Sequence, residues 1–349
     1  MDEHVAPIDE AAHGRLHDPR TLVAFGIAHA PPGLVSDEAK GRLATIPDAL
    51  PATFEVGAFE CHLGHGTGRV DFEACVRAVG GGRAALAPAL ASPAIERLAS
   101  QEDGWRRTIA FLRAWSDPTS ALHHGVDAAW LEFDLDHGAV PSPFVVFTLC
   151  RDEDERAPYS ARYATALRDA LDLLASGVPA GVASTVEAAV AALAPTGALL
   201  HAGVRPLEHG AVVRLVARLP RPHIPAYLDR IGWPGSATEL ARVLHELCPS
   251  TVLHSLNLDV AERVGPRVGV EYHFRTSPLD DPRWQSVFDG LVATGACTPE
   301  RREQVSAWRP RGHAMRAPMR EVLVKVVHEP GRPLAAKAYL PFTTGAWTG

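Results

Sequence analysis

Hydrophobic and polar residues alternate along two runs near the C-terminal end of the chain, between residues 320 and 342, and a Pro-Gly pair separates the runs. Two alternating runs joined by such a pair are typical of a β-hairpin. Successive side chains of a strand point to opposite faces, so Lys325, Lys337 and Tyr339 should share one face. The other face is apolar and carries Val322, Val324, Val326, Ala336, Ala338 and Leu340.

Four more pairs of alternating runs precede this hairpin: 54–63 with 69–76, 128–135 with 143–150, 199–205 with 211–219, and 251–260 with 268–276. Apolar residues at helical spacing follow each of these pairs. The helices so predicted cover 93–115, 160–175, 184–193, 224–231, 237–247 and 284–292. Residues 1–50 have no strong period, apart from a short strand expected at Val23–Ile27. We therefore expect an N-terminal surface segment over 1–50 and a single barrel domain over 51–349.

The repeated order of two strands and then helix predicts an α+β protein built from ββα units. Ten antiparallel strands can close into a β-barrel, and closure removes the exposed edges of the sheet. In that arrangement the apolar strand faces pack outward against the helices and the polar faces line the interior. The alternative is an open antiparallel α+β sandwich, in which the same charged residues face water.

The polar strand faces give the candidate lining of the barrel. It consists of Trp130, Glu132, Asp134, His201, Arg205, Arg214, Arg218, Glu271, His273, Arg275, Lys325, Lys337 and Tyr339. Acids and bases are mixed in this set. Such a lining suits a peptide, which offers amides, carboxylates and cationic groups, and we take these residues as candidate peptide-binding residues.

The composition narrows the class of partner. The 349-residue chain carries a net charge of −7, which argues against non-specific nucleic-acid binding. Its acidic N-terminal residues do not resemble a secretory signal, and no apolar run approaches the ~18 residues of a membrane span. The five cysteines are scattered and lack paired spacing, which indicates a reduced, cytoplasmic protein.

Five ββα units with this sidedness resemble the barrel of the ABBA aromatic prenyltransferases. The resemblance implies a diphosphate held by basic side chains, and Arg205, Arg214, Arg275, Lys325 and Lys337 are the candidates for that role. It also implies tyrosines that shield an allylic cation. The chain has five tyrosines, of which Tyr339 is predicted inward and Tyr272 outward. No D-D-x-x-D metal box is present, because Asp280-Asp281 is followed by Pro-Arg-Trp.

The strand W-L-E-F-D-L (130–135) and the hairpin of 324–340 also resemble the peptide-binding β-barrel proteins of crocagin biosynthesis. Those proteins hold a ribosomally made precursor peptide while a pyrroloindoline forms on it. The resemblance implies a non-catalytic or accessory protein that binds a precursor peptide, with the pathway's modification enzymes as further candidate partners. It implies no cofactor, no nucleic acid and no membrane. The resemblance is also compatible with a homodimer. The competing expectation is an aromatic or peptide prenyltransferase that uses an allylic diphosphate.

Weaker patterns add little to these two hypotheses. Cys61, His62 and His65 have the residue types of a zinc site, but a strand entering a glycine turn would not bring all three together, so we expect no metal. Glu271 and His273 are spaced as an acid–base pair on one strand face, although ion pairing explains them equally well. No nucleophile motif is present, and we assign no catalytic residue.

Overall fold

The computed structural model describes residues 18–48, 50, 54–65, 69–78, 81–135, 142–150, 161–207, 210–247, 253–273, 282–308 and 322–343. Ten antiparallel strands close into a barrel in the order β1-β10-β9-β8-β7-β6-β5-β4-β3-β2. The strands are β1 (Val56–His62), β2 (Val70–Arg77), β3 (Val126–Phe133), β4 (Phe144–Leu149), β5 (Ala198–Leu207), β6 (Gly210–Arg218), β7 (Leu253–Val260), β8 (Val264–His273), β9 (Leu323–His328) and β10 (Ala335–Phe342). This confirms the predicted barrel and excludes the open sandwich.

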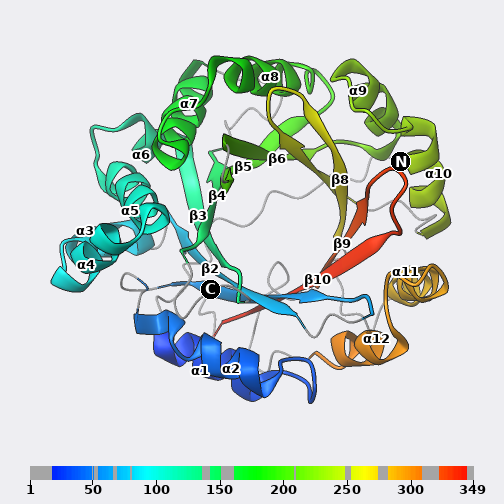
Figure 1. Cartoon of the computed structure of the whole chain (residues 1–349), viewed down its shortest axis with the longest axis horizontal. Helices are drawn as coiled ribbons and strands as arrows, with labels where there is room; N and C mark the ends of the chain where they lie inside the picture. The colour runs from blue at the N-terminus through cyan, green and yellow to red at the C-terminus, as the bar shows by residue number, and fades with distance from the viewer. Residues whose placement is uncertain are drawn as a thin grey trace.

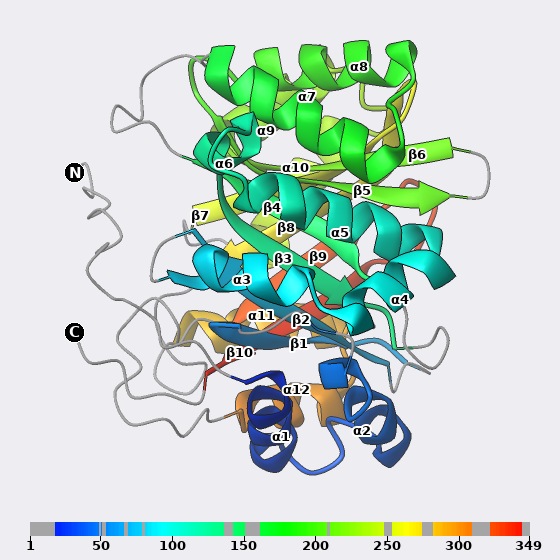
Figure 2. The ribbon, with the colours of Figure 1, turned by 90° about the vertical axis from the view of Figure 1, so that its left-hand side faces the viewer.

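Helices surround the barrel, as the views down its axis and from the side show (Figures 1 and 2). They are α1 (Pro19–His29), α2 (Asp37–Leu43), α3 (Gly82–Leu90), α4 (Pro93–Gln101), α5 (Asp103–Ser116), α6 (Ala121–Gly125), α7 (Ala161–Ala175), α8 (Ala180–Ala191), α9 (Ile224–Arg230), α10 (Ala237–Leu247), α11 (Pro282–Ala293) and α12 (Pro299–Ser306). Two 3₁₀ turns, η1 (Ile46–Asp48) and η3 (Arg221–His223), complete the described elements.

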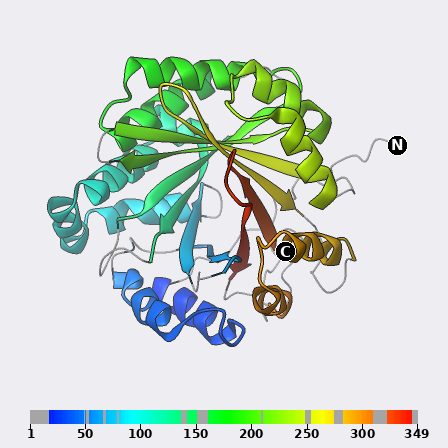
Figure 3. The same ribbon diagram turned by 45° about the vertical axis from the view of Figure 1, so that its right-hand side comes forward.

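The hydrophobic core lies between the barrel and these helices. Val324, Ala338 and Leu340 of the last hairpin belong to the same buried cluster as Trp284 and Leu291 of α11. The rotated view shows the helices on the outer side of the strands (Figure 3). The apolar strand faces therefore look outward, as the alternation predicted, and the polar faces are left to the interior.

The predicted strand at Val23–Ile27 is wrong, because these residues lie in α1. Asp18 caps that helix by accepting a hydrogen bond from the backbone N–H of Thr21 at 3.0 Å, and Pro19 occupies its first turn. The buried residues Leu22, Val23 and Gly26 fall on one helical face. The helix packs against the outside of β1.

The helix predicted at 93–115 is two helices, α4 and α5, with Glu102 in extended conformation between them. Helix α3 was not predicted, because its Ala-rich segment with Pro88 has no clear period. The other predicted helices agree with α7 to α11 within a few residues. No helix among the described residues is long and apolar enough to cross a membrane.

Candidate functional site

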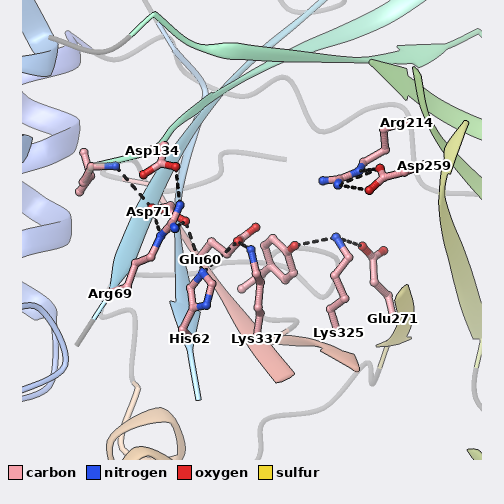
Figure 4. Close-up of polar contacts among 12 residues, drawn as sticks. Glu60, His62, Arg69, Asp71, Asp134, Arg214, Asp259, Glu271, Lys325 and Lys337 are labelled. Atoms are coloured by element: carbon pink, nitrogen blue, oxygen red, sulfur yellow. Dashed lines mark hydrogen bonds and ion pairs between the residues drawn. The ribbon is translucent and has the colours of Figure 1, made fainter. Parts of the chain in front are cut away.

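Ion pairs cross the interior of the barrel between neighbouring strands. Lys337 of β10 pairs with Glu60 of β1, and Lys325 of β9 lies 3.3 Å from Glu271 of β8. The Lys325 ammonium also donates to the Tyr339 hydroxyl at 2.8 Å. Figure 4 shows Glu60, Lys337, Lys325 and Glu271 close to one another, on the successive strands β1, β10, β9 and β8. The strand register explains the convergence, because Lys325 is the direct neighbour of both Glu271 and Lys337.

A second pair lies on the adjacent strands β6 and β7. Arg214 donates to both carboxylate oxygens of Asp259, from Nε at 3.0 Å and from Nη2 at 3.2 Å. Burial alone would lower the pKa of Arg214, but Asp259, Glu132 and Tyr339 together outweigh that effect and raise it. The guanidinium groups of Arg205 and Arg214 both lie over the ring of Phe144, at 5.7 and 5.6 Å from its centroid.

A small, partly open pocket lies beside these pairs. It is lined by Arg205, Arg214, Asn257, Asp259, Arg267, Gly269, Lys325, Val327 and Lys337. Five of these residues are basic and one is acidic. Within the described part of the chain, the side chains of Arg205 and Arg267 form no hydrogen bond or ion pair. The pocket therefore presents positive charge that the surrounding strands do not neutralise.

Crowding of like charge is visible in Arg205 itself. Burial and the neighbouring Arg214 lower the pKa of Arg205, and Arg267 adds to the effect. An anion bound among these three guanidinium groups would relieve their repulsion. Arginine is suited to that role because its planar donors match carboxylate and phosphate oxygens.

Carboxyl groups gather on the opposite side of the barrel. Glu73 of β2 faces Glu132 of β3 directly across the two strands. Burial, followed by repulsion from Glu132 and Glu60, raises the pKa of Glu73 well above its usual range. Burial and Glu60 raise the pKa of Glu132 to about 7. Burial opposes ionisation of Glu60 too, but Lys337 and Lys325 hold its pKa well below the ordinary value.

A further charged group occupies the end of β1 and β2. Arg69 lies 3.1 Å from Asp71 and 2.5 Å from Asp134, and His62 Nε2 lies 3.6 Å from Asp71. Ligand atoms of Glu60, His62 and Asp71 lie within 4.8 Å of one another. Because Lys337 and Arg69 already neutralise the two carboxylates, the set fits an ion-pair network better than a metal site.

Cys61 points away from that group. Its side chain belongs to the buried core outside the barrel, and burial raises the pKa of its thiol to about 12. Neighbouring residues of a strand face opposite sides, so Cys61 and His62 cannot bind one metal ion together. The sequence argument against a zinc site at Cys61, His62 and His65 is thereby given a structural reason.

Most of the predicted lining residues meet in the interior. The ones that converge are Glu132, Arg205, Arg214, Glu271, Lys325, Lys337 and Tyr339. Trp130 is on the same strand face as Glu132 and packs on the small cluster of Val56, Cys75 and Ala128. His201 bonds Thr148 at 2.9 Å, and Arg218 lies opposite Ser255 near the end of β6. The side chain of His273 and all of Arg275 lie outside the described residues.

The sequence analysis missed several interior groups: Glu60, Asp71, Glu73, Asn257, Asp259 and Arg267. A signal for some of them was present. In β2, Asp71, Glu73 and Cys75 alternate with Val70, Phe72, Ala74 and Val76, which is the same two-sided pattern that identified Lys325 and Lys337. Asn257 and Asp259 likewise alternate with Leu256 and Leu258 in β7.

Comparisons with known proteins identify the fold. No family model and no curated protein sequence matches the chain. Solved ABBA prenyltransferase barrels do match its structure. One is 5-dimethylallyl tryptophan synthase from Streptomyces coelicolor in complex with DMASPP and Trp, with a TM-score of 0.55, 15% identity and coverage of 95% of each chain.

Two further structures give the same picture. AnaPT from Neosartorya fischeri has a TM-score of 0.58 at 12% identity, covering 94% of this chain and 93% of that one. The 6-dimethylallyltryptophan synthase from Micromonospora olivasterospora, in complex with DMASPP and Trp, has a TM-score of 0.51 at 12% identity, covering 83% and 82%. At such low identity the likeness concerns the fold.

Proposed function

We propose that this barrel binds an allylic diphosphate in its basic pocket and transfers the prenyl group to an aromatic or peptide acceptor. The observation that carries the proposal is the pair Arg205 and Arg267, which lie beside Arg214 in the pocket without an anionic partner among the described residues. Both residues are half-buried, and a cation that is partly removed from water without a partner is costly unless a ligand completes it. A diphosphate supplies several negative oxygens at the required spacing.

The proposed reaction needs little covalent chemistry from the protein. The allylic C–O bond breaks, its electron pair leaves with the diphosphate, and the acceptor supplies the electrons of the new bond to the prenyl carbon. Cations placed where the leaving group gains charge lower the barrier to this step. The rings of Tyr339 and Phe144 face the same interior and would stabilise the allylic cation. Glu60, which Lys337 keeps ionised, is available to accept the proton that the acceptor loses.

The fold adds support at a coarser level. Two of the similar structures are dimethylallyltryptophan synthases in complex with DMASPP and Trp. Folds host many unrelated functions, so this likeness raises the expectation without assigning any residue. The residues proposed here come from the geometry of this chain alone.

A second candidate is a non-catalytic protein that binds a precursor peptide in a ribosomal peptide pathway. The observation that favours it is the internal pairing of Lys337 with Glu60 and of Lys325 with Glu271. These pairs leave an interior with both signs of charge, which suits peptide groups. Tyr339 is also the one tyrosine that the described strands direct inward, so a tyrosine shield is largely missing.

An assay of prenyl transfer decides between the two. The purified chain is incubated with dimethylallyl diphosphate and either tryptophan or a tryptophan-containing precursor peptide, and products are analysed by mass spectrometry. We expect a prenylated product that is lost in Arg205→Met and Arg267→Met and retained in Arg242→Met, whose side chain is 62% exposed on α10. Peptide binding without prenyl transfer would support the second candidate. If neither prenyl transfer nor peptide binding is observed, both candidates are excluded.

A further inference from the structure

Glu73 is a buried acid without a partner among the described residues. Its residue is only 7% exposed, yet within the described ranges its carboxyl group forms no hydrogen bond and no ion pair. The half-buried Glu132, directly opposite on β3, has none in those ranges either. A buried carboxyl group without a partner is costly, so a protein that keeps Glu73 in this state beside a second carboxyl group has a use for the two.

The position of the two acids adds to this observation. In the closed strand order, β2 and β3 lie across the barrel from β7 and β8, which carry Asn257, Asp259 and Arg267 of the basic pocket. A ligand bound in the interior would therefore contact cationic side chains on one wall of the barrel and carboxyl groups on the other. A molecule with an anionic end and a cationic end fits such a polarised lining.

We propose that Glu73 and Glu132 form a subsite for a cationic nitrogen, an ammonium or a guanidinium group, on the molecule that accepts the prenyl group. This inference rests on the proposed function, because it names the acceptor's charge at the same interior site. The two carboxyl groups would bind the cation from adjacent strands as charge-assisted hydrogen-bond acceptors. The subsite thereby selects basic acceptors over neutral ones of equal shape.

The charged and titratable groups that face the subsite set its protonation. They are Glu60 on β1, Arg214 on β6, Glu271 on β8, Lys325 on β9, and Lys337 and Tyr339 on β10. Burial and the repulsion among the acids raise the pKa values of Glu73 and Glu132. The empty subsite therefore keeps its protons to a higher pH than ordinary carboxyl groups do, and an arriving cation favours their release. Proton release on binding is a direct signature of the subsite.

The test compares two probes that differ in one group. Tryptamine carries an ammonium where tryptophol carries a hydroxyl, and both keep the indole ring and its N–H. Each is titrated into the protein by calorimetry at pH 7, in two buffers of different ionisation enthalpy. We expect tryptamine to bind at least about tenfold more tightly than tryptophol, since a charge-assisted pair is stronger than a neutral one. Only tryptamine should release protons.

Variants locate the effect. Gln has the shape of a protonated Glu, so Glu73→Gln and Glu132→Gln should fold, and circular dichroism checks this. Each should remove the preference for tryptamine and the proton release, while Glu239→Gln on the exposed face of α10 should change neither. If the probes bind equally, or if both interior variants keep the preference, the subsite is refuted.

A separate titration distinguishes this failure from failure of the proposed function. Inorganic diphosphate should bind the wild type and Glu73→Gln alike, because the basic pocket lies on other strands. Binding of diphosphate with no preference for tryptamine would overturn the amine subsite alone. Absence of diphosphate binding would overturn the pocket on which the proposed function depends.

Discussion

Lys337 and Glu60 illustrate how the interior tolerates charge. Their side chains are 17% and 9% exposed, and each lies beside further charged groups of the barrel wall. A buried pair of this kind contributes little net stability, because the desolvation of both ions offsets their attraction. Removal of one partner is a different matter, since the remaining charge stays buried alone.

We predict that Lys337→Met lowers the free energy of unfolding by about 3 kcal/mol at pH 7, because it leaves Glu60 without its main cation. The double variant Lys337→Met with Glu60→Gln should recover most of that loss. Urea unfolding followed by circular dichroism measures both. Equal stabilities of the single and the double variant would contradict the account.

Glu132 should make stability depend on pH in the opposite sense to most acids. Its pKa is about 7 in the folded protein, against an ordinary value of 4.5. The folded state therefore holds this proton more tightly than the unfolded state does. As pH rises from about 4.5 to 7, the unfolded chain gains from ionising Glu132 and the folded chain does not, so stability is lost across that window.

Glu132→Gln removes this loss. We predict that the variant equals the wild type at pH 4 and is more stable at pH 8 by on the order of 1–3 kcal/mol, a range that allows for partial exposure of the side chain. Urea unfolding at the two pH values provides the measurement. If the difference in stability between Glu132→Gln and the wild type is the same at pH 4 and at pH 8, Glu132 ionises in the folded barrel as it does in the unfolded chain.

At the scale of elements, helix α1 is fixed to the barrel by a close contact. Gly26 lies against Phe342 of β10, and three ring carbons would come closer than 3.0 Å to a Cβ atom added there. Phe342 also contacts Phe59 of β1, with ring centroids 4.9 Å apart. The helix thus covers the seam where the first and last strands pair. Gly41 of α2, by contrast, has no atom within 4 Å of such a Cβ.

The two glycines give a matched pair of substitutions inside helices. Gly26→Ala should lower the free energy of unfolding by about 1–3 kcal/mol, because Phe342 must move out of a packed core. Gly41→Ala should raise it by about 0.5–1 kcal/mol, since alanine favours helix. Thermal and urea unfolding of both variants test this. No loss of stability in Gly26→Ala would mean that α1 does not pack closely against Phe342, and a loss in Gly41→Ala would mean that the space beside α2 is occupied.

The elements were predictable to the extent that their residues alternate. The last hairpin could be placed within a residue or two, because Val322, Val324 and Val326 lie on one face of the strand and Lys325 lies on the other. Helix α1 could not be recognised, since its buried residues Leu22, Val23 and Gly26 are too few to set a helical period. Its orientation depends on Phe342, far along the chain, and no local pattern encodes that contact.

At the scale of the molecule, barrel closure brings together residues that are distant in sequence. Glu60 and Lys337 are 277 positions apart, and they meet only because β1 pairs with β10. The inward face of Lys337 could be predicted from the alternation of its strand, but its partner could not. For the same reason Arg205 could be predicted to face the interior, but not to share a pocket with Arg267, because strands β5 and β8 are not neighbours in the sheet.

The central claim is that the barrel interior carries an anion site formed by strands that are far apart in the sequence. Calorimetric titration with inorganic diphosphate tests it most directly. We predict saturable binding that weakens with added salt and falls at least about tenfold in Arg205→Met and in Arg267→Met, as expected for loss of a charge-assisted contact. Arg242→Met should bind as the wild type does. An absence of binding, or equal affinity in all four proteins, would contradict the account.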